Sequence, residues 1–309
     1  MGNAYLLFLM LDLLRLWKFS RPHTIIGTSL SVFALYAIAL ATTDSSIFQP
    51  DLGQLFGTWI ACLCGNVYIV GLNQLYDVEI DRINKPDLPL ASGEFSITQG
   101  KWIVGITGIL AIAIAAVLGQ WLLATVVVSL TIGTAYSLPP IRFKRFPLLA
   151  AICILTVRGC IVNLGLFSHF DRVLNDRDIL PSSIWVLTLF ILVFTIAIAI
   201  FKDVADLEGD RQYQIQTFTL ALGKPAVFNL TRWAITLAYL GTIGAGIFIL
   251  PTINTWFFVG SHTVLLCLLW WRSQDTDLEE KKSIADFYQF IWKLFFLEYI
   301  LFPIACFVN

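Results

Sequence analysis

The sequence has 309 residues, of which 58% are hydrophobic and 13% are charged, and its mean hydropathy is +0.79. Soluble domains carry roughly 25% charged residues, so this composition is typical of a chain that lies largely within a membrane. The net charge of -1 provides no basic field for a polyanion, and we therefore exclude nucleic acid as a partner.

Apolar runs separated by charged or proline-containing breaks predict about nine membrane-spanning helices, since each span needs about 20 apolar residues. We expect these helices at residues 22–42, 52–73, 99–117, 120–138, 147–167, 183–201, 226–250, 254–271 and 285–307. Residues 5–19 mix charges into an apolar stretch, which predicts an interfacial helix. We therefore expect a single all-α integral membrane domain over 1–309, with the interfacial helix within 1–21 and the transmembrane bundle over 22–309.

The basic residues predict the orientation of this bundle, because short cytoplasmic loops retain Lys and Arg. Most of them fall in alternate loops, whereas the opposite side holds only Arg172 and Arg177. This bias places the N-terminus and the loops after the second and sixth spans in the cytoplasm.

Two acidic motifs follow those two spans. In the first, Asn73, Asp77 and Asp81 lie four residues apart, which places them on one face of a helix. In the second, Asp206 and Asp210 share a face with Asp203. Carboxylates at membrane depth are costly and repel one another unless a cation balances them.

All these candidate ligands are oxygens, which favours Mg²⁺ over zinc or copper. Because Mg²⁺ is commonly completed by substrate phosphates, the motifs predict a phosphate or diphosphate ligand. The alternative for each motif is a solvated helix end without a ligand.

The turn after Pro139-Pro140 carries Arg142, Lys144 and Arg145, because paired prolines end a helix. These cations could bind diphosphate, or they could only anchor the chain on the cytoplasmic side. Arg158 lies about two turns inside a span, where an arginine is functional by default. It could bind an acidic substrate or form a structural ion pair.

Other polar residues are weaker candidates. His23 could accept a proton or bind a substrate, and Asn163 could simply hydrogen-bond a neighbouring helix. His169 and His262 lie near span ends, so we expect them at the interface. The many aromatic residues, Phe295 among them, are expected mostly to face lipid or the interfacial belt.

The residues above resemble the UbiA superfamily of intramembrane aromatic prenyltransferases. Its hallmarks are Asn-x3-Asp-x3-Asp after the second helix and Asp-x3-Asp after the sixth, matched here at Asn73, Asp77 and Asp81 and at Asp206 and Asp210. Within the superfamily, residues 73–94, 157–165, 201–223 and 287–299 are similar to the cyanobacterial and plastid members that prenylate homogentisate. Plastid members begin with a transit peptide that this sequence lacks, which favours a cyanobacterial source, in the thylakoid or plasma membrane.

The resemblance implies a UbiA-like bundle around a central cavity. It also implies transfer of the phytyl group from phytyl diphosphate to homogentisate with loss of CO₂. Two Mg²⁺ ions would bridge the diphosphate, held by Asn73, Asp77, Asp81, Asp206 and Asp210. The cations implied to bind the diphosphate are Arg82, Arg142, Lys144 and Lys202. The candidates for the acceptor site are Arg158, His23, Asn163 and Tyr136.

One local feature departs from several superfamily members, which carry Tyr-x3-Lys in the loop after the fourth helix. Here Pro140 follows Tyr136 at that offset and Lys144 is the first lysine, so the basic role would pass to Arg142 and Lys144.

Three enzymatic alternatives share the diphosphate chemistry: homogentisate solanesyltransferase, 4-hydroxybenzoate polyprenyltransferase and chlorophyll synthase. An alternative from another class is a secondary transporter that uses its acids as ion relays. Transporters place such acids near the bilayer midplane, whereas these cluster at helix ends.

Overall fold

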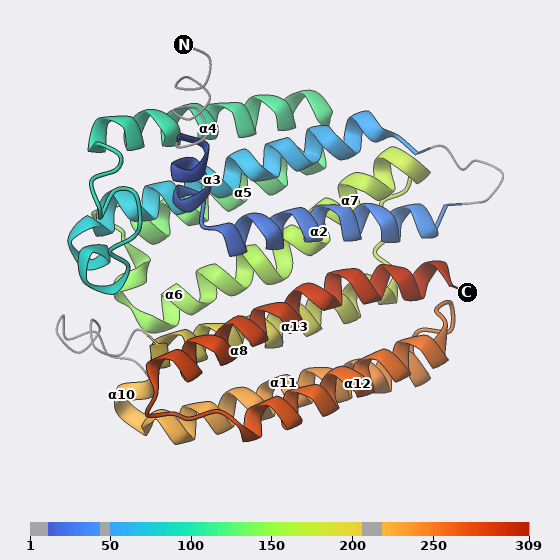
Figure 1. Cartoon of the computed structure of the whole chain (residues 1–309). Coiled ribbons are helices and arrows are strands. Elements are labelled where there is room, and N and C mark those ends of the chain that lie inside the picture. The colour runs from blue at the N-terminus through green and yellow to red at the C-terminus, as the bar shows by residue number, and fades with distance from the viewer. Residues whose placement is uncertain (1–11, 44–49, 206–217, 309) are drawn as a thin grey trace, which may run out of the picture. The chain divides into compact units, whose positions relative to one another are not determined.

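The computed structural model describes residues 12–43, 50–205 and 218–308, and over these residues the chain is helical without β-strands (Figure 1). Contacts divide the chain into two compact units. The first unit comprises Met1–Ser29 and Phe56–Lys144, and the second comprises Leu30–Leu55 and Arg145–Asn309. The predicted all-α class is confirmed, and the single domain over 1–309 stays a prediction.

The first unit is built on three long helices: most of α3 (Leu52–Asn84), all of α4 (Ile97–Leu118) and all of α5 (Gln120–Ser137). Helix α4 begins at a capping box, in which the Ser96 side chain accepts the Gln99 backbone N–H. Helix α5 ends before Pro139-Pro140, as paired prolines require. The start of α2 (Pro22–Ala41) and a helical turn over residues 12–19 complete the described part of this unit.

The core of the first unit forms where the helix over 12–19 meets α3 and α4. Phe19, Leu72, Leu90 and Val104 are buried together. Gly71 permits this packing, because a Cβ there would lie 2.7 Å from the Phe19 ring and from Val104. Small residues allow such close helix contacts in membrane proteins, where lipid supplies no hydrophobic drive between helices.

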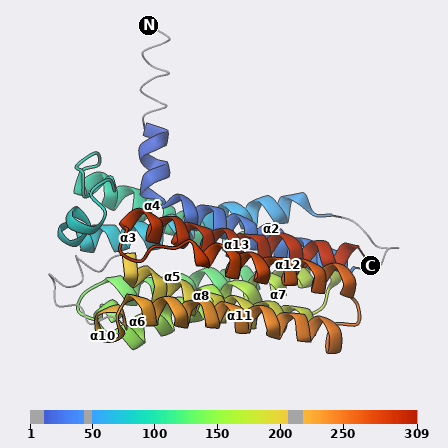
Figure 2. The same cartoon turned by 60° about the horizontal axis from the view of Figure 1, so that its bottom comes forward.

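The second unit contains the remaining long helices (Figure 2). They are α6 (Pro147–Ile154), η2 (Leu155–Ile161), α7 (Val162–Asn175), α8 (Ser182–Ala205), α11 (Lys224–Phe248), α12 (Thr255–Gln274) and α13 (Lys281–Phe307), with the short α10 (Phe218–Leu222). The short η1 (Phe143–Arg145) begins in the first unit and ends in the second. Helix α8 packs against η2, α11 and α13, and α12 packs against α11 and α13.

Helices α6, η2 and α7 follow one another without a break, but the middle segment is a π-helix. At its end the Val162 N–H donates to the carbonyl oxygen of Val157, five residues back rather than four. The sequence predicts a regular helix here and contains no signal for the wider turn. Wide turns of this kind often occur at functional sites.

Seven helices are long and apolar enough to cross a membrane: α2, α3, α4, α5, the continuous Leu148–Asn175, α8 up to Lys202, and α13. Outward-facing apolar side chains accompany them, including Trp102 and Val117, which are 67% and 86% exposed. Such exposure is stable only where lipid replaces water. The chain is therefore an integral membrane protein, while the expected total of about nine spans stays a prediction.

Gly108 of α4 provides a test of this packing, because a Cβ there would lie 2.6 Å from the Tyr68 ring, whereas Gly105 has open space. We expect Gly108→Leu to destabilise the protein by about 1–3 kcal/mol through overpacking. Gly105→Leu should be neutral or slightly stabilising, since leucine favours a helix over glycine by almost 1 kcal/mol. Thermal unfolding in detergent measures both, and equal melting temperatures would contradict the close contact.

Candidate functional site

The first acidic motif lies on one face of α3, as its spacing predicts. The Asn73 side-chain amide donates to Asp77 Oδ2 at 3.0 Å. Asp81 follows one turn later and is 6% exposed. Helix α3 continues to Asn84, so the motif is helical throughout rather than part of a loop after residue 73.

Three cations converge on this face from two other segments. Lys144 Nζ lies 2.6 Å from Asp77 Oδ2, and Arg142 Nη2 lies 3.0 Å from Asp77 Oδ1. Arg21 Nη2 donates to Asn73 Oδ1 at 3.2 Å and lies 4.0 Å from Asp81 Oδ2. The acids are thus balanced by positive charge from the turns before α2 and after α5.

The two arginines adopt a backbone conformation that side chains rarely take. Arg21 has φ of 54° and Arg142 has φ of 41°; both fall in the left-handed region. A non-glycine residue there costs about 1–2 kcal/mol. Strained backbone conformations are common at functional sites, where contacts with the surrounding structure stabilise them.

Several polar atoms in this cluster are buried without a hydrogen-bond partner among the described residues. They are Arg21 Nε, Asp81 Oδ2 and Arg142 Nε, whereas Lys144 Nζ contacts the Asp77 carboxylate. Buried polar atoms are normally satisfied, so unsatisfied donors beside an unsatisfied carboxylate oxygen fit a ligand that supplies both anionic oxygens and a metal cation. Burial lowers the pKa of the Lys144 ammonium, and the nearby Asp77 carboxylate opposes this effect.

The second motif, with Asp206 and Asp210, lies outside the described residues. Helix α8 ends just before it, and the Lys202 side chain is exposed on the last turn. Among the described residues, no three His, Cys, Asp or Glu side chains gather closely enough to hold a metal by themselves.

The structure places the remaining candidates of the first unit as follows. Arg82 turns away from Asp77 and pairs with Glu79 at 2.9 Å on the exposed surface of α3. His23 is half-buried in the first turn of α2, two residues after Arg21, and Tyr136 is half-buried near the end of α5.

In the second unit, Arg158 lies in the π-helical turn, where its guanidinium stacks over the Trp292 ring with 5.0 Å to the centroid. Asn163 is fully buried and accepts a hydrogen bond from the Tyr299 hydroxyl at 2.9 Å. The sequence singles out Arg158 and Asn163, and the structure shows them one turn apart beside α13.

Two predictions for the second unit are wrong. His169 and His262 are buried rather than interfacial, and His262 Nε2 lies 3.1 Å from Glu298, which is also fully buried. Phe295 does not face lipid, since it is 2% exposed against Trp292 and Tyr299. The His262–Glu298 pair joins α12 to α13, and its 36-residue separation hides it from any local pattern.

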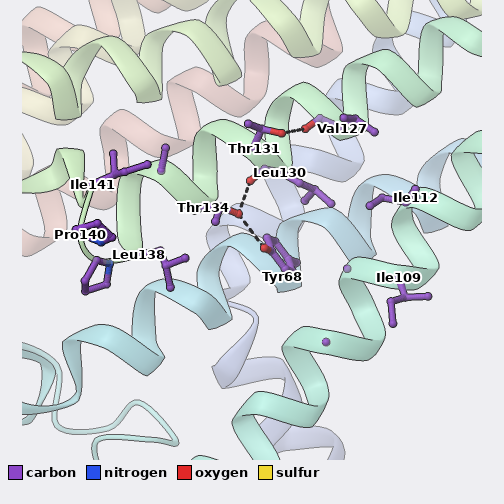
Figure 3. Close-up of a pocket in the computed structure, with 14 residues that line it drawn as sticks. Tyr68, Ile109, Ile112, Val127, Leu130, Thr131, Thr134, Leu138, Pro140 and Ile141 are labelled. Atoms are coloured by element: carbon purple, nitrogen blue, oxygen red, sulfur yellow. Dashed lines mark hydrogen bonds between the residues drawn. The ribbon is translucent and has the colours of Figure 1, made fainter.

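A separate apolar groove lies on the first unit between α4 and α5, with a volume of about 570 Å³ (Figure 3). Its polar feature is a 2.8 Å hydrogen bond between the Tyr68 and Thr134 hydroxyls. Tyr68 precedes Asp77 by nine residues, which is two and a half turns, so the groove lies on the opposite face of α3 from the acids. Its apolar lining suits hydrocarbon rather than a charged ligand.

Arg21 is the functional residue of the acidic cluster that sequence reasoning missed. The sequence shows it only as one more cytoplasmic cation before Pro22. Its contact with Asn73 depends on tertiary structure. The one local feature that could have drawn attention to Arg21 is its position in the turn before a helix that begins with proline. The contacts of Trp292 and Tyr299 with Arg158 and Asn163 were also not predictable, because the sequence does not distinguish these two residues from its many other aromatic residues.

Comparison with known proteins completes the description of the site. Residues 30–294 match the UbiA prenyltransferase family. The homogentisate phytyltransferase of Synechocystis sp. is 61% identical over 290 residues, covering 94% of each chain. Homogentisate phytyltransferase 1 of Arabidopsis thaliana is 41% identical, over 93% of this chain and 74% of the plant protein. The fold is similar to that of a UbiA homolog from Archaeoglobus fulgidus solved with GPP and Mg²⁺, with a TM-score of 0.63, 15% identity and coverage of 96% and 100%.

The charge balance at Asp77 can be tested by substitution. We expect Asp77→Asn to destabilise the protein by about 2–4 kcal/mol, because it leaves two largely buried cations, Arg142 and Lys144, without their carboxylate. Glu79→Gln is the matched control on the same helix, since Glu79 is 75% exposed and its ion pair contributes little. Thermal unfolding in detergent measures both variants; equal small shifts would show that Asp77 is not needed to balance these cations.

Proposed function

The chain belongs to the UbiA prenyltransferase family, and from this premise we propose that it transfers the phytyl group of phytyl diphosphate to homogentisate. The observation that carries the reaction type is the face of Asn73, Asp77 and Asp81 with three cations aimed at it. The choice of substrates follows from the 61% identity to a homogentisate phytyltransferase over nearly the whole of both chains.

The expected cofactor is Mg²⁺, which fits the oxygen donors and the unsatisfied Asp81 carboxylate oxygen. Asn73, Asp77 and Asp81 would hold one ion, and Asp206 and Asp210 would hold a second. When bound, the metal supplies positive charge that neutralises the diphosphate oxygens. Magnesium and an isoprenoid diphosphate together in the Archaeoglobus homolog support this proposal.

The protein's own cations assist departure of the diphosphate. Three cations lie beside the motif acids: Arg21, Arg142 and Lys144. The Nε atoms of Arg21 and Arg142 have no hydrogen-bond partner and can donate to diphosphate oxygens. As the allylic C–O bond breaks, its electron pair moves to the diphosphate, and fixed cations stabilise the charge that develops there. Arg82 and Lys202 remain further candidates for the same role.

The phytyl cation then forms a C–C bond with the electron-rich homogentisate ring, which loses a proton. The acetate side chain loses CO₂ and its remaining CH₂ carbon takes up a proton to become a methyl group, so the product is 2-methyl-6-phytyl-1,4-benzoquinol, a precursor of tocopherol. Water would capture the cation, and an apolar helical bundle excludes it. His23 and Tyr136 are candidates near the first motif for contact with the acceptor.

The basic loops support an orientation in which the motifs and the N-terminus face the cytoplasm. The similarity to a cyanobacterial enzyme supports a thylakoid or plasma membrane of a cyanobacterium as the location. Solanesyl or geranylgeranyl donors and 4-hydroxybenzoate are the nearest alternative substrates. Family membership sets aside the transporter alternative.

The activity can be tested with the purified protein in detergent. We expect formation of 2-methyl-6-phytyl-1,4-benzoquinol from homogentisate and phytyl diphosphate in the presence of Mg²⁺, and its loss with EDTA. Asp77→Ala and Asp206→Ala should each reduce kcat at least about 100-fold, because each removes a ligand of the diphosphate-bound metal. Glu79→Gln should retain activity.

The same assay separates the alternatives. Faster turnover with solanesyl or geranylgeranyl diphosphate would assign that diphosphate as the donor. Cleavage of phytyl diphosphate without prenylation of homogentisate would show that the acceptor is a different compound. Full activity of both alanine variants would refute the metal site.

A further inference from the structure

We infer that Arg158, set in the π-helical turn and covered by Trp292, is the binding group for the carboxylate of the aromatic acceptor. This inference deepens the proposed function and depends on it. Arg158 and the residues that hold its turn in place all belong to the second unit.

The π-helical turn is fixed by a chain of buried hydrogen bonds. The Asn163 side-chain amide donates to the carbonyl oxygens of Gly159, at 2.7 Å, and Arg158, at 3.3 Å. Its Oδ1 accepts the Tyr299 hydroxyl of α13 at 2.9 Å. Backbone carbonyls freed by the wide turn therefore have partners, and the turn is locked to α13. On its other side, Gly159 lies against Leu192 of α8 with no room for a side chain.

This locked turn carries a cation deep in the bundle. Arg158 lies ten residues into the Leu148–Asn175 helix, about 15 Å from its start, within a segment long and apolar enough to cross a membrane. A charge within such an apolar span is costly and normally has a partner. Among the described residues, no carboxylate forms an ion pair with Arg158.

The side chains around Arg158 favour a carboxylate as its ligand. Trp292 covers one face of the guanidinium, and Tyr288 and Tyr299 also lie close to it. The side chain keeps part of its surface accessible. A guanidinium stacked on an aromatic ring presents its edge, whose parallel N–H groups match the two oxygens of a carboxylate.

An arylacetate fits these surroundings better than a diphosphate does. Its single charge matches the single cation, and its ring can pack on Tyr288, the aromatic side chain beside Trp292 on α13 that stays partly exposed. A diphosphate carries several charges and would need further cations. An acceptor without the carboxylate would leave Arg158 desolvated and unpaired, so this contact would select for acidic acceptors.

The experiment compares homogentisate with its uncharged amide, 2,5-dihydroxyphenylacetamide, as acceptors for Arg158→Met, Arg158→Lys and the wild type. We expect Arg158→Met to raise the KM for homogentisate roughly 10- to 100-fold and to abolish the preference for the acid over the amide. The KM for phytyl diphosphate should change less than about twofold. Arg158→Lys should recover part of the preference, because it keeps the charge but loses the fork of parallel donors.

Lys293→Met is the matched control, since Lys293 is the neighbouring cation on α13 but is exposed. It should leave both KM values unchanged. The inference would be overturned if Arg158→Met still preferred homogentisate over the amide. It would also be overturned if the KM values for homogentisate and phytyl diphosphate rose equally, since Arg158 would then have a structural role or bind the diphosphate. If Arg158→Met does not fold, Arg158→Lys is compared with the wild type. A weaker preference for homogentisate over the amide would support the inference, and an unchanged preference would overturn it. Failure of the wild type to prenylate either acceptor would refute the proposed function itself.

Discussion

A charge buried in an apolar bundle must be balanced, and this constraint organises the whole structure. Three acids are buried among the described residues: Asp81, Asp171 and Glu298. Asp171 accepts a hydrogen bond from Asn175 and Glu298 contacts His262, while Asp81 lies at the edge of the Arg21 guanidinium. The carboxylates of Asp171 and Glu298 therefore have polar partners within the protein. Asp81 retains an oxygen without a hydrogen bond, which is why its surroundings can accept a metal and an anion.

The same constraint explains how the cations are arranged. Arg142 and Lys144 approach Asp77 from a turn created by Pro139-Pro140, and Arg21 approaches Asn73 from the turn before α2. Rigid helices position the acids, and short turns position the cations. Under the proposed function, a diphosphate would replace Asp77 as the partner of these cations without their first losing bound water, which would lower the cost of reorganisation.

Local periodicity made much of this predictable from the sequence. The four-residue spacing of Asn73, Asp77 and Asp81 fixes their common face whatever the tertiary structure, and consecutive prolines fix the end of α5. Residues brought together by packing were not predictable. The His262–Glu298 pair, the Arg21–Asn73 contact and the burial of Phe295 depend on which helices are neighbours. The π-helical turn also lacked a signal, because its stabilising partner Tyr299 lies 136 residues from Asn163.

The left-handed backbone of Arg21 and Arg142 also bears on how such a protein evolves. Glycine would occupy either position with less strain, by about 1 kcal/mol, so selection for thermostability alone would favour its appearance there. Under the proposed function, selection for turnover would oppose this substitution, because glycine has no guanidinium to bind the diphosphate. The two arginines would then retain backbone strain for the sake of activity, and a more heat-stable variant would have to gain its stability elsewhere in the fold.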